Sequence, residues 1–205
     1  MKWFALGSVV MFGLVVAVLL QALGPKPIVN VAERPVAIAT MPCERDLQAT
    51  SSGIVFDDET IITVAHAIYE SRDFAVRDAA GTWYRPTIQH LDLERDLAVL
   101  KVEGLAAEAL ATRQARAGES VRMLEGAASG TIDGDILRRV EISTEVIGDL
   151  STTSKRSGYE LTVEIVGGDS GAAVLGDDDS LVGLIFARST DRDASWATSV
   201  MRGWR

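Results

Sequence analysis

The chain has 205 residues, 47% of them hydrophobic, and a formal net charge of −9 at pH 7. This length accommodates one domain with its own core and a short extension. The acidic balance, with no basic patch interleaved with aromatic side chains, argues against nucleic acid as a partner. The single cysteine, Cys43, excludes a disulfide within the chain, so the core alone must stabilise the domain.

The N-terminus carries an apolar run without charge at residues 3–20, directly after Lys2. About 20 apolar residues span a bilayer as a helix, and a preceding positive charge keeps that end in the cytoplasm. We therefore expect residues 1–24 to form a transmembrane anchor with the rest of the chain facing outward. A cleaved signal peptide is the alternative, but Pro25 is a poor neighbour for a cleavage site.

Prolines are frequent in the next segment, residues 25–47. Because proline fixes φ and removes a backbone donor, this composition is typical of an extended linker. We expect a stem at residues 25–47 that connects the anchor to one folded domain at residues 48–205.

Short apolar segments separated by polar turns fill the rest of the chain, which indicates an all-β domain. We predict strands at residues 50–56, 60–65, 74–77, 82–84, 97–102, 121–124, 136–142, 144–147, 160–165, 172–175 and 181–187. The acidic run at 177–179 is expected to be a solvated hairpin tip, because it lacks the ligand spacing of a calcium site. We expect no metal site.

Two of these strands adjoin residues suited to acid–base chemistry. The strand at 60–65 runs directly into His66, where a general base would sit at a strand end. Asp96 comes directly before the apolar strand at 97–102, so its carboxylate is expected to be buried.

Neighbouring residues of the same types are weaker candidates. Asp92 and Glu94 lie close to Asp96, but neither directly precedes the apolar strand. His90 lies beside a turn without a matching motif, and we expect a surface or structural role for it.

The segment Gly167-Gly168-Asp169-Ser170-Gly171 lies between two apolar runs. A serine on a tight glycine turn suits a nucleophile, and its weakly nucleophilic hydroxyl would need the His66 imidazole as base. The amides of Gly168 and Ser170 would point together as an oxyanion hole. Asp96 would hold the imidazole tautomer, and the order His, Asp, Ser is that of the chymotrypsin arrangement.

The segments T-V-A-H, D-L-A-V-L and G-D-S-G resemble the T-A-A-H, D-[IL]-A-[LV]-[LIV] and G-D-S-G motifs of trypsin/chymotrypsin-like serine proteases, the PA clan. The chain is most similar to bacterial trypsin-like peptidase domains, including the protease part of HtrA-type proteins. The resemblance covers residues 48–205 and implies two antiparallel six-stranded β-barrels with the active site between them. It implies no cofactor, and it makes residues 104–116 a linker with at most a turn or two of helix.

Two residues depart from the family's pattern. Ala172 replaces the usual second glycine after the nucleophile, which slightly crowds the strand behind it. Asp169 lacks the freed N-terminal amine with which the matching aspartate pairs in trypsin-type zymogens. A buried carboxylate needs a partner, and by analogy with bacterial members we expect Arg138 or Arg139.

The same resemblance suggests a substrate pocket. Glu164 falls where trypsin-like enzymes place the base of the S1 pocket, which would favour Arg or Lys in the substrate. The alternative, which we favour, is an outward residue of the strand at 160–165. Arg188 at the pocket entrance would oppose a cationic side chain, and Phe186 stands where the family often has a small polar residue near the catalytic acid.

The sequence therefore predicts a membrane-anchored, extracytoplasmic serine endopeptidase that forms an acyl-enzyme intermediate. Its partners would be a protein or peptide substrate, the membrane and a regulatory protein of the envelope. Two alternatives stay open. One is a catalytically inactive or latent protease-fold protein that binds or scaffolds in the cell envelope, and the other is an envelope subunit whose activity needs a partner.

Overall fold

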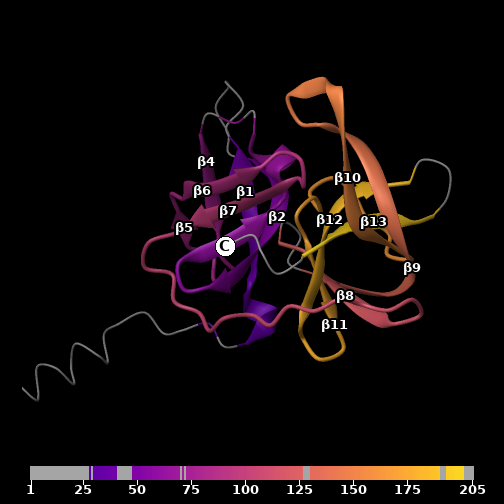
Figure 1. The fold of residues 1–205 in the computed structure, drawn as a ribbon. Helices are drawn as coiled ribbons and strands as arrows, with labels where there is room; N and C mark the ends of the chain where they lie inside the picture. Colours follow the sequence, from indigo (N-terminus) through magenta and orange to yellow (C-terminus); the bar gives the residue numbers. More distant parts are fainter. Residues whose placement is uncertain are drawn as a thin grey trace, which may run out of the picture.

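The computed structural model describes residues 28–200 except 29, 41–47, 70, 72, 127–129 and 190–192. Two antiparallel β-sheets lie side by side, one from each half of the chain (Figure 1). The first contains β1 (Pro35–Thr40), β2 (Gln48–Asp57), β3 (Thr60–Thr63), β4 (Phe74–Arg77), β5 (Trp83–Tyr84), β6 (Thr87–Asp92) and β7 (Leu97–Lys101). The second contains β8 (Ser120–Leu124), β9 (Thr131–Val146), β10 (Asp149–Leu161), β11 (Ala173–Gly176), β12 (Leu181–Arg188) and β13 (Ser195–Ser199).

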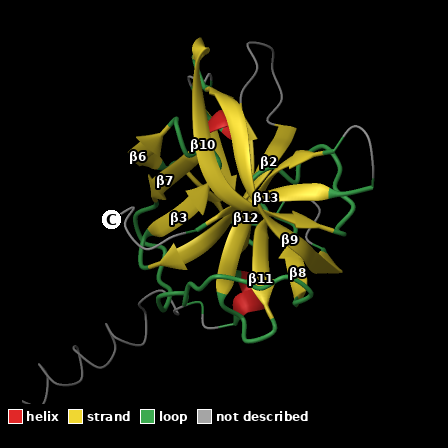
Figure 2. Ribbon diagram, turned by 45° about the vertical axis from the view of Figure 1, so that its right-hand side comes forward, coloured by secondary structure: helices red, strands yellow, loops and turns green. Residues whose placement is uncertain are grey.

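The second sheet closes into a barrel in the order β10-β13-β12-β11-β8-β9, which confirms the expected six-stranded barrel (Figure 2). Its interior is a continuous apolar cluster that includes Met123, Tyr159, Leu161 and Ile185. The hydroxyl of buried Tyr159 accepts a hydrogen bond from the Ala115 amide at 3.0 Å, so the end of the linker is tied to this barrel.

The first sheet differs from the expected six-stranded barrel. It has seven strands in the open order β5-β4-β1-β2-β3-β7-β6. Both end strands are poor partners for closure. Strand β5 has two residues and is soon followed by Pro86, which lacks a backbone donor, and β6 is exposed along residues 87–90.

Part of the expected stem belongs to this sheet. Residues 35–40 form β1, which pairs with both β2 and β4. All of its residues except Thr40 are buried, and a strand buried on both faces shows a continuous apolar run in place of alternation. We did not predict this strand because the prolines of the segment indicated an extended stem. A 3₁₀ turn, η1 (Val31–Glu33), precedes the strand.

The hairpin of β9 and β10 is longer than expected and reaches the first sheet. The strands expected at 136–142 and 144–147 are one strand, and the one expected at 160–165 ends at Leu161. At the hairpin tip, a Cβ on Gly148 would meet the Tyr69 hydroxyl at 2.4 Å. Nearer its base, the Ser154 hydroxyl donates to the Glu94 carbonyl at 2.5 Å.

The linker between the sheets is irregular, as expected, and its regular contacts are single bridges of Ala107 with Ile28 and of Thr112 with Leu181. In the part of the chain that the structure describes, no helix has the length and apolar character needed to cross a membrane. The expected anchor at residues 1–24 lies outside the described residues, as does Cys43.

Candidate active site

Strand pairing brings His66 and Asp96 together. Strands β3 and β7 are antiparallel neighbours in register, with Thr63 opposite Ala98. His66 lies three residues after this pair, in the 3₁₀ turn η2 (Ala65–Ala67), and Asp96 lies two residues before it. Buried apolar residues on both strands fix that register.

The Asp96 carboxylate holds His66 at two points. Asp96 Oδ2 lies 2.8 Å from His66 Nδ1, and Asp96 Oδ1 accepts the His66 backbone N–H at 2.8 Å. The Asp96 backbone has φ 56°, in the left-handed region that a non-glycine residue seldom adopts. The Asp96 side chain is 3% exposed and that of His66 is 37% exposed, so the acid is buried while the imidazole reaches solvent.

The loop of Ser170, between β10 and β11, has the backbone expected of a nucleophile turn. Gly168 has φ 109° and Gly171 has φ 86°, both favourable only for glycine. The amides of Asp169, Gly171 and Ala172 donate to backbone carbonyls. Among the described residues, the amides of Gly168 and Ser170 donate to no protein group, so these two N–H groups are free to bind an oxyanion.

Ser52 on β2 connects this loop to the first sheet. Its amide donates to the Ser170 carbonyl at 2.7 Å and its hydroxyl donates to the Gly168 carbonyl at 2.9 Å. Its carbonyl accepts from the Thr63 hydroxyl at 2.7 Å, three residues before His66. A Cβ on Gly171 would come within 2.0 Å of the Ser52 carbonyl oxygen, so only glycine fits there.

This connection is indirect. Within the described residues, no hydrogen bond joins the Ser170 hydroxyl to the His66 imidazole. Such contacts are often long in unliganded enzymes and tighten with substrate. Sequence reasoning missed Ser52 and Thr63, because serine and threonine are common in strands and carry no motif of their own.

Asp169 has partners other than the expected arginines. Arg138 Nε donates to Glu160 at 2.6 Å and Arg139 Nη1 donates to Gln114 at 3.1 Å. Asp169 Oδ2 instead accepts the Val166 amide at 2.7 Å, and its carboxylate lies beside that of Glu125. Burial raises the pKa of the Glu125 carboxyl, and the charge of Asp169 and a hydrogen bond to it raise that pKa further.

Arg156 on β10 reaches Asp96 from the barrel. Arg156 Nη1 lies 3.3 Å from Asp96 Oδ2, and the guanidinium carbon lies 4.8 Å from the centroid of the Phe186 ring. No motif predicted this residue, since a single arginine in a strand gives no signal in the sequence.

The residues expected at the substrate pocket are spread over two elements. Glu164 is exposed between buried Val163 and Ile165, so it points outward as expected, but it lies in the loop after β10 and not on a strand. Phe186 is half-buried on β12 and stacks on Trp196, and Arg188 is exposed at the end of β12.

A family model, the trypsin-like peptidase domain, matches residues 51–184. The chain belongs to this family. No curated protein sequence matched it. Three solved structures show the fold of this peptidase domain. The active form of the Rv3671c protease from M. tuberculosis is 20% identical, with a TM-score of 0.73 over 83% of this chain and 77% of that chain.

The other two structures are also remote in sequence. The MamO protease domain from Magnetospirillum magneticum, in its apo form, is 15% identical, with a TM-score of 0.66 over 83% of this chain and 92% of that one. The HtrA-type protease AlgW, solved with a decapeptide, is 16% identical, with a TM-score of 0.66 over 83% of this chain and 62% of that one.

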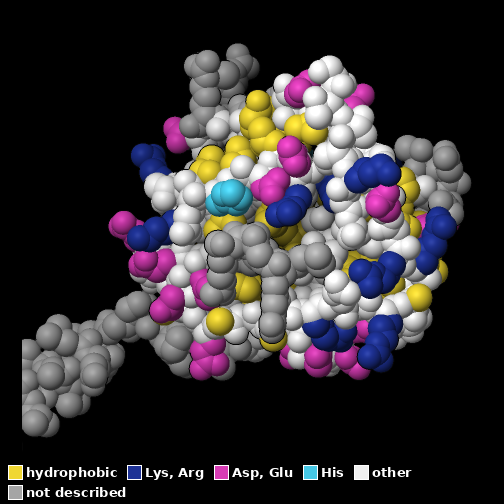
Figure 3. Space-filling model, in the orientation of Figure 1, with side chains coloured by type: hydrophobic (Ala, Val, Ile, Leu, Met, Phe, Trp, Pro, Cys, Tyr) yellow, Lys and Arg dark blue, Asp and Glu magenta, His cyan; other side chains and the backbone are white. Residues whose placement is uncertain are grey.

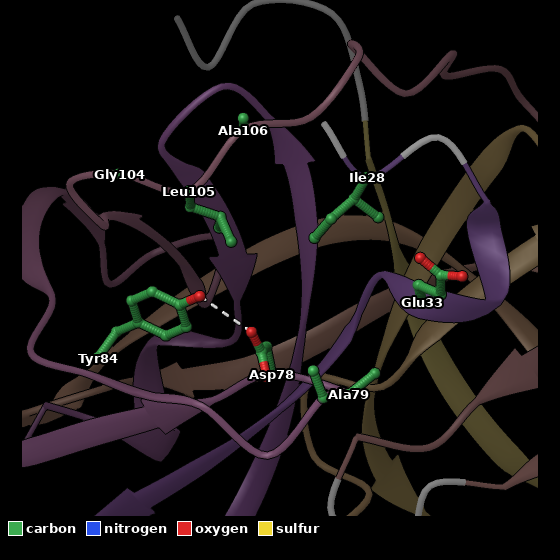
Figure 4. A pocket seen from close by; sticks show the side chains of 9 residues that line it. Ile28, Glu33, Asp78, Ala79, Tyr84, Gly104, Leu105 and Ala106 are labelled. Atoms are coloured by element: carbon green, nitrogen blue, oxygen red, sulfur yellow. Dashed lines mark hydrogen bonds between the residues drawn. The ribbon is translucent and has the colours of Figure 1, made fainter. Parts of the chain in front are cut away.

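The peptidase domain also has a cavity of about 510 Å³ apart from these residues (Figure 4). Leu105 and Ala106 of the linker line it together with Tyr84 and Asp78, whose side chains are hydrogen-bonded at 2.9 Å. Burial and the Asp78 carboxylate raise the pKa of Tyr84.

On the face in Figure 3, acidic and basic side chains lie interspersed, without one large region of either sign.

Proposed function

We propose that the chain is a serine endopeptidase in which Ser170 is the nucleophile, His66 the general base and Asp96 the residue that orients the imidazole. The observation that carries this proposal is the pair of hydrogen bonds that joins His66 to the Asp96 carboxylate. Both residues belong to the first sheet, and Ser52 of that sheet is hydrogen-bonded to the Ser170 loop. The AlgW structure contains a decapeptide, which is in keeping with a peptide as substrate here.

The reaction would follow from these positions. His66 Nε2 takes the proton of the Ser170 hydroxyl as Oγ attacks the substrate carbonyl carbon. The amides of Gly168 and Ser170 stabilise the oxyanion. The imidazolium returns its proton to the leaving amine, which departs as the peptide C–N bond breaks. Water, activated by the same imidazole, then releases the acyl group from Ser170.

We further propose that the apolar run at residues 3–20 anchors the enzyme in the membrane with the peptidase domain outside the cytoplasm. The support is the length of that run and the position of Lys2 before it. The peptidase domain would then bind its protein or peptide substrates, and a regulatory protein, in the cell envelope.

Labelling with a fluorophosphonate tests the catalytic proposal, because this reagent modifies activated serines. The wild-type full chain should be labelled, and Ser170→Ala should abolish the labelling. Ser151→Ala is the matched control, since Ser151 is exposed on β10 and, within the described part of the chain, its hydroxyl bonds only to the nearby Asp149, at 2.6 Å. Labelling of Ser170→Ala equal to the wild type would contradict the proposal.

A latent or inactive binding protein is the second candidate. The absence of a hydrogen bond between Ser170 and His66 among the described residues favours it. A folded wild-type chain that takes no label and cleaves no peptide would select this candidate.

A further inference from the structure

Arg156 brings a buried positive charge to the His66–Asp96 pair from the opposite sheet. Its Nη1 lies 3.3 Å from Asp96 Oδ2, and the side chains of Arg156 and Asp96 are 6% and 3% exposed. A buried charge without a partner is strongly destabilising, so each of these two charges depends on the other.

Two further contacts fix the guanidinium. Arg156 Nη2 donates to the Thr144 hydroxyl at 2.6 Å. Its face covers the Phe186 ring, which stacks in turn on Trp196 with 6.4 Å between the ring centroids. A planar guanidinium stacks on a ring and donates from its edge at the same time, which the ammonium of lysine cannot do.

The contact with Asp96 is one of charge. Among the described residues, Arg156 Nε and Nη1 have no aligned hydrogen-bond acceptor, although Nη1 lies within ion-pair distance of Asp96. Both Asp96 oxygens already accept hydrogen bonds from His66. Arg156 therefore acts on the charge of Asp96 and leaves the two bonds that orient the imidazole intact.

We propose that Arg156 is a positioning residue of the triad, which holds the Asp96 carboxylate in place and offsets part of its charge. This inference rests on the proposed peptidase function and adds to it a residue outside the three motifs. The guanidinium suits this role because it stacks on the Phe186 ring while its Nη1 faces Asp96.

The nearest other charged side chains pair elsewhere or are exposed to solvent. Arg95 lies 3.5 Å from the carboxylate of Asp92, and Lys155 lies 2.9 Å from that of Glu141. Glu94 and Arg188 are exposed. Within the described residues, His66 and Arg156 are the two side chains that form ion pairs with Asp96.

The proposal predicts a change that a purely structural ion pair would not cause. Without the guanidinium, the less firmly held Asp96 carboxylate should orient the imidazole less well, so the chemical step should slow while substrate binding stays the same. A structural ion pair would affect the melting temperature and leave kcat unchanged.

The test compares Arg156→Met with Arg139→Met in the full chain. Arg139 is exposed on neighbouring β9 and donates to neutral Gln114. NMR follows the proton of His66 Nδ1 in its contact with Asp96, which His90→Gln assigns because the chain has only two histidines. In Arg156→Met this signal should broaden or disappear, and kcat should fall roughly tenfold or more at nearly constant KM. Arg139→Met should change neither.

Two milder variants keep the proposal testable if Arg156→Met does not fold. Thr144→Val removes only the anchor of Nη2 and should change the Nδ1 proton signal and kcat in the same direction by less. Arg156→Lys keeps a charge but loses the planar guanidinium, so kcat should fall less than in Arg156→Met. A folded Arg156→Met with an unchanged Nδ1 proton signal and kcat would overturn the proposal. If the wild type proves inactive, the peptidase proposal fails, and the Nδ1 proton signal still decides whether Arg156 holds the pair in place.

Discussion

We expect Glu125 to make the stability of the fold depend on pH, because its carboxyl is buried beside that of Asp169. Burial and Asp169 raise the pKa of Glu125 above its ordinary value of 4.5. An acid with a raised folded-state pKa stabilises the fold below its ordinary value, and that contribution is lost as the pH rises through the folded-state pKa. We therefore expect the wild-type melting temperature to fall as the pH is raised above 4.5 and Glu125 ionises.

Glu125→Gln should remove this component, because glutamine is neutral at every pH. When melting temperatures are measured at a series of pH values above 4.5, they should decrease less with pH for this variant than for the wild type. Glu145→Gln is the control, since Glu145 is exposed on β9, and its curves should follow those of the wild type. Parallel pH dependence of Glu125→Gln and the wild type would show that Glu125 does not ionise in this range.

The sequence located the motif residues and missed their supports for a physical reason. His66, Asp96 and Ser170 each adjoin an apolar strand or a glycine turn, which are local patterns. Arg156 and Glu125 act across elements far apart in the chain, and such contacts depend on register. The expectation of Arg138 for Asp169 failed in the same way, because register places Arg138 opposite Glu160 on β10.

Among the strands, β2 connects the two halves of the site through one hydroxyl. The Ser52 hydroxyl donates to the Gly168 carbonyl and accepts the Gly126 amide at 3.1 Å. Ser52→Ala removes the hydrogen-bond partner of the Gly168 carbonyl and of the Gly126 amide. We therefore expect a loss of about 1–3 kcal/mol in the free energy of unfolding. Activity should fall as well, because Gly168 carries one of the proposed oxyanion donors.

The adjacent residue is a matched control for this change. Ser51 is 1% exposed, and its hydroxyl has no hydrogen-bond partner among the described residues. Ser51→Ala should therefore be neutral or slightly stabilising in denaturant titrations, although it removes the same atom from the same strand. Equal losses from the two variants would mean that the bonds of Ser52 contribute nothing to stability.

Apart from β1, strands with strong apolar patterns were predicted, and β6 and β13, which lack them, were not. Segments such as β4 and β7 coincide with expectation to within a residue. Strand β6 is mostly exposed, and β13 mixes serine and threonine with buried Ala197, so neither shows a clear hydrophobic period. The long β9 looked like two segments because polar residues dominate its exposed face.

For the whole molecule, the resemblance predicted two closed barrels, and the structure has one closed barrel beside an open sheet. The difference arises at the edges, where β5 is too short and β6 too exposed to pair further. The open sheet still carries the site, because the pairing of β3 with β7 brings His66 and Asp96 together without closure of the sheet.

The stability of the first sheet depends on β1, which lies in the proline-rich segment that we expected to be a stem. Ile38 is 0% exposed, between β2 and β4, whereas Ile88 on edge strand β6 is 46% exposed. Ile38→Ala should therefore lower the free energy of unfolding by about 2–5 kcal/mol, and Ile88→Ala should change it by no more than about 0.5 kcal/mol. Denaturant unfolding of both variants measures the difference. If Ile38→Ala leaves the free energy of unfolding unchanged, residues 35–40 would belong to the stem and not to the folded domain. A large loss would extend the folded domain to include β1, and any shorter version of the protein would then have to begin before Pro35.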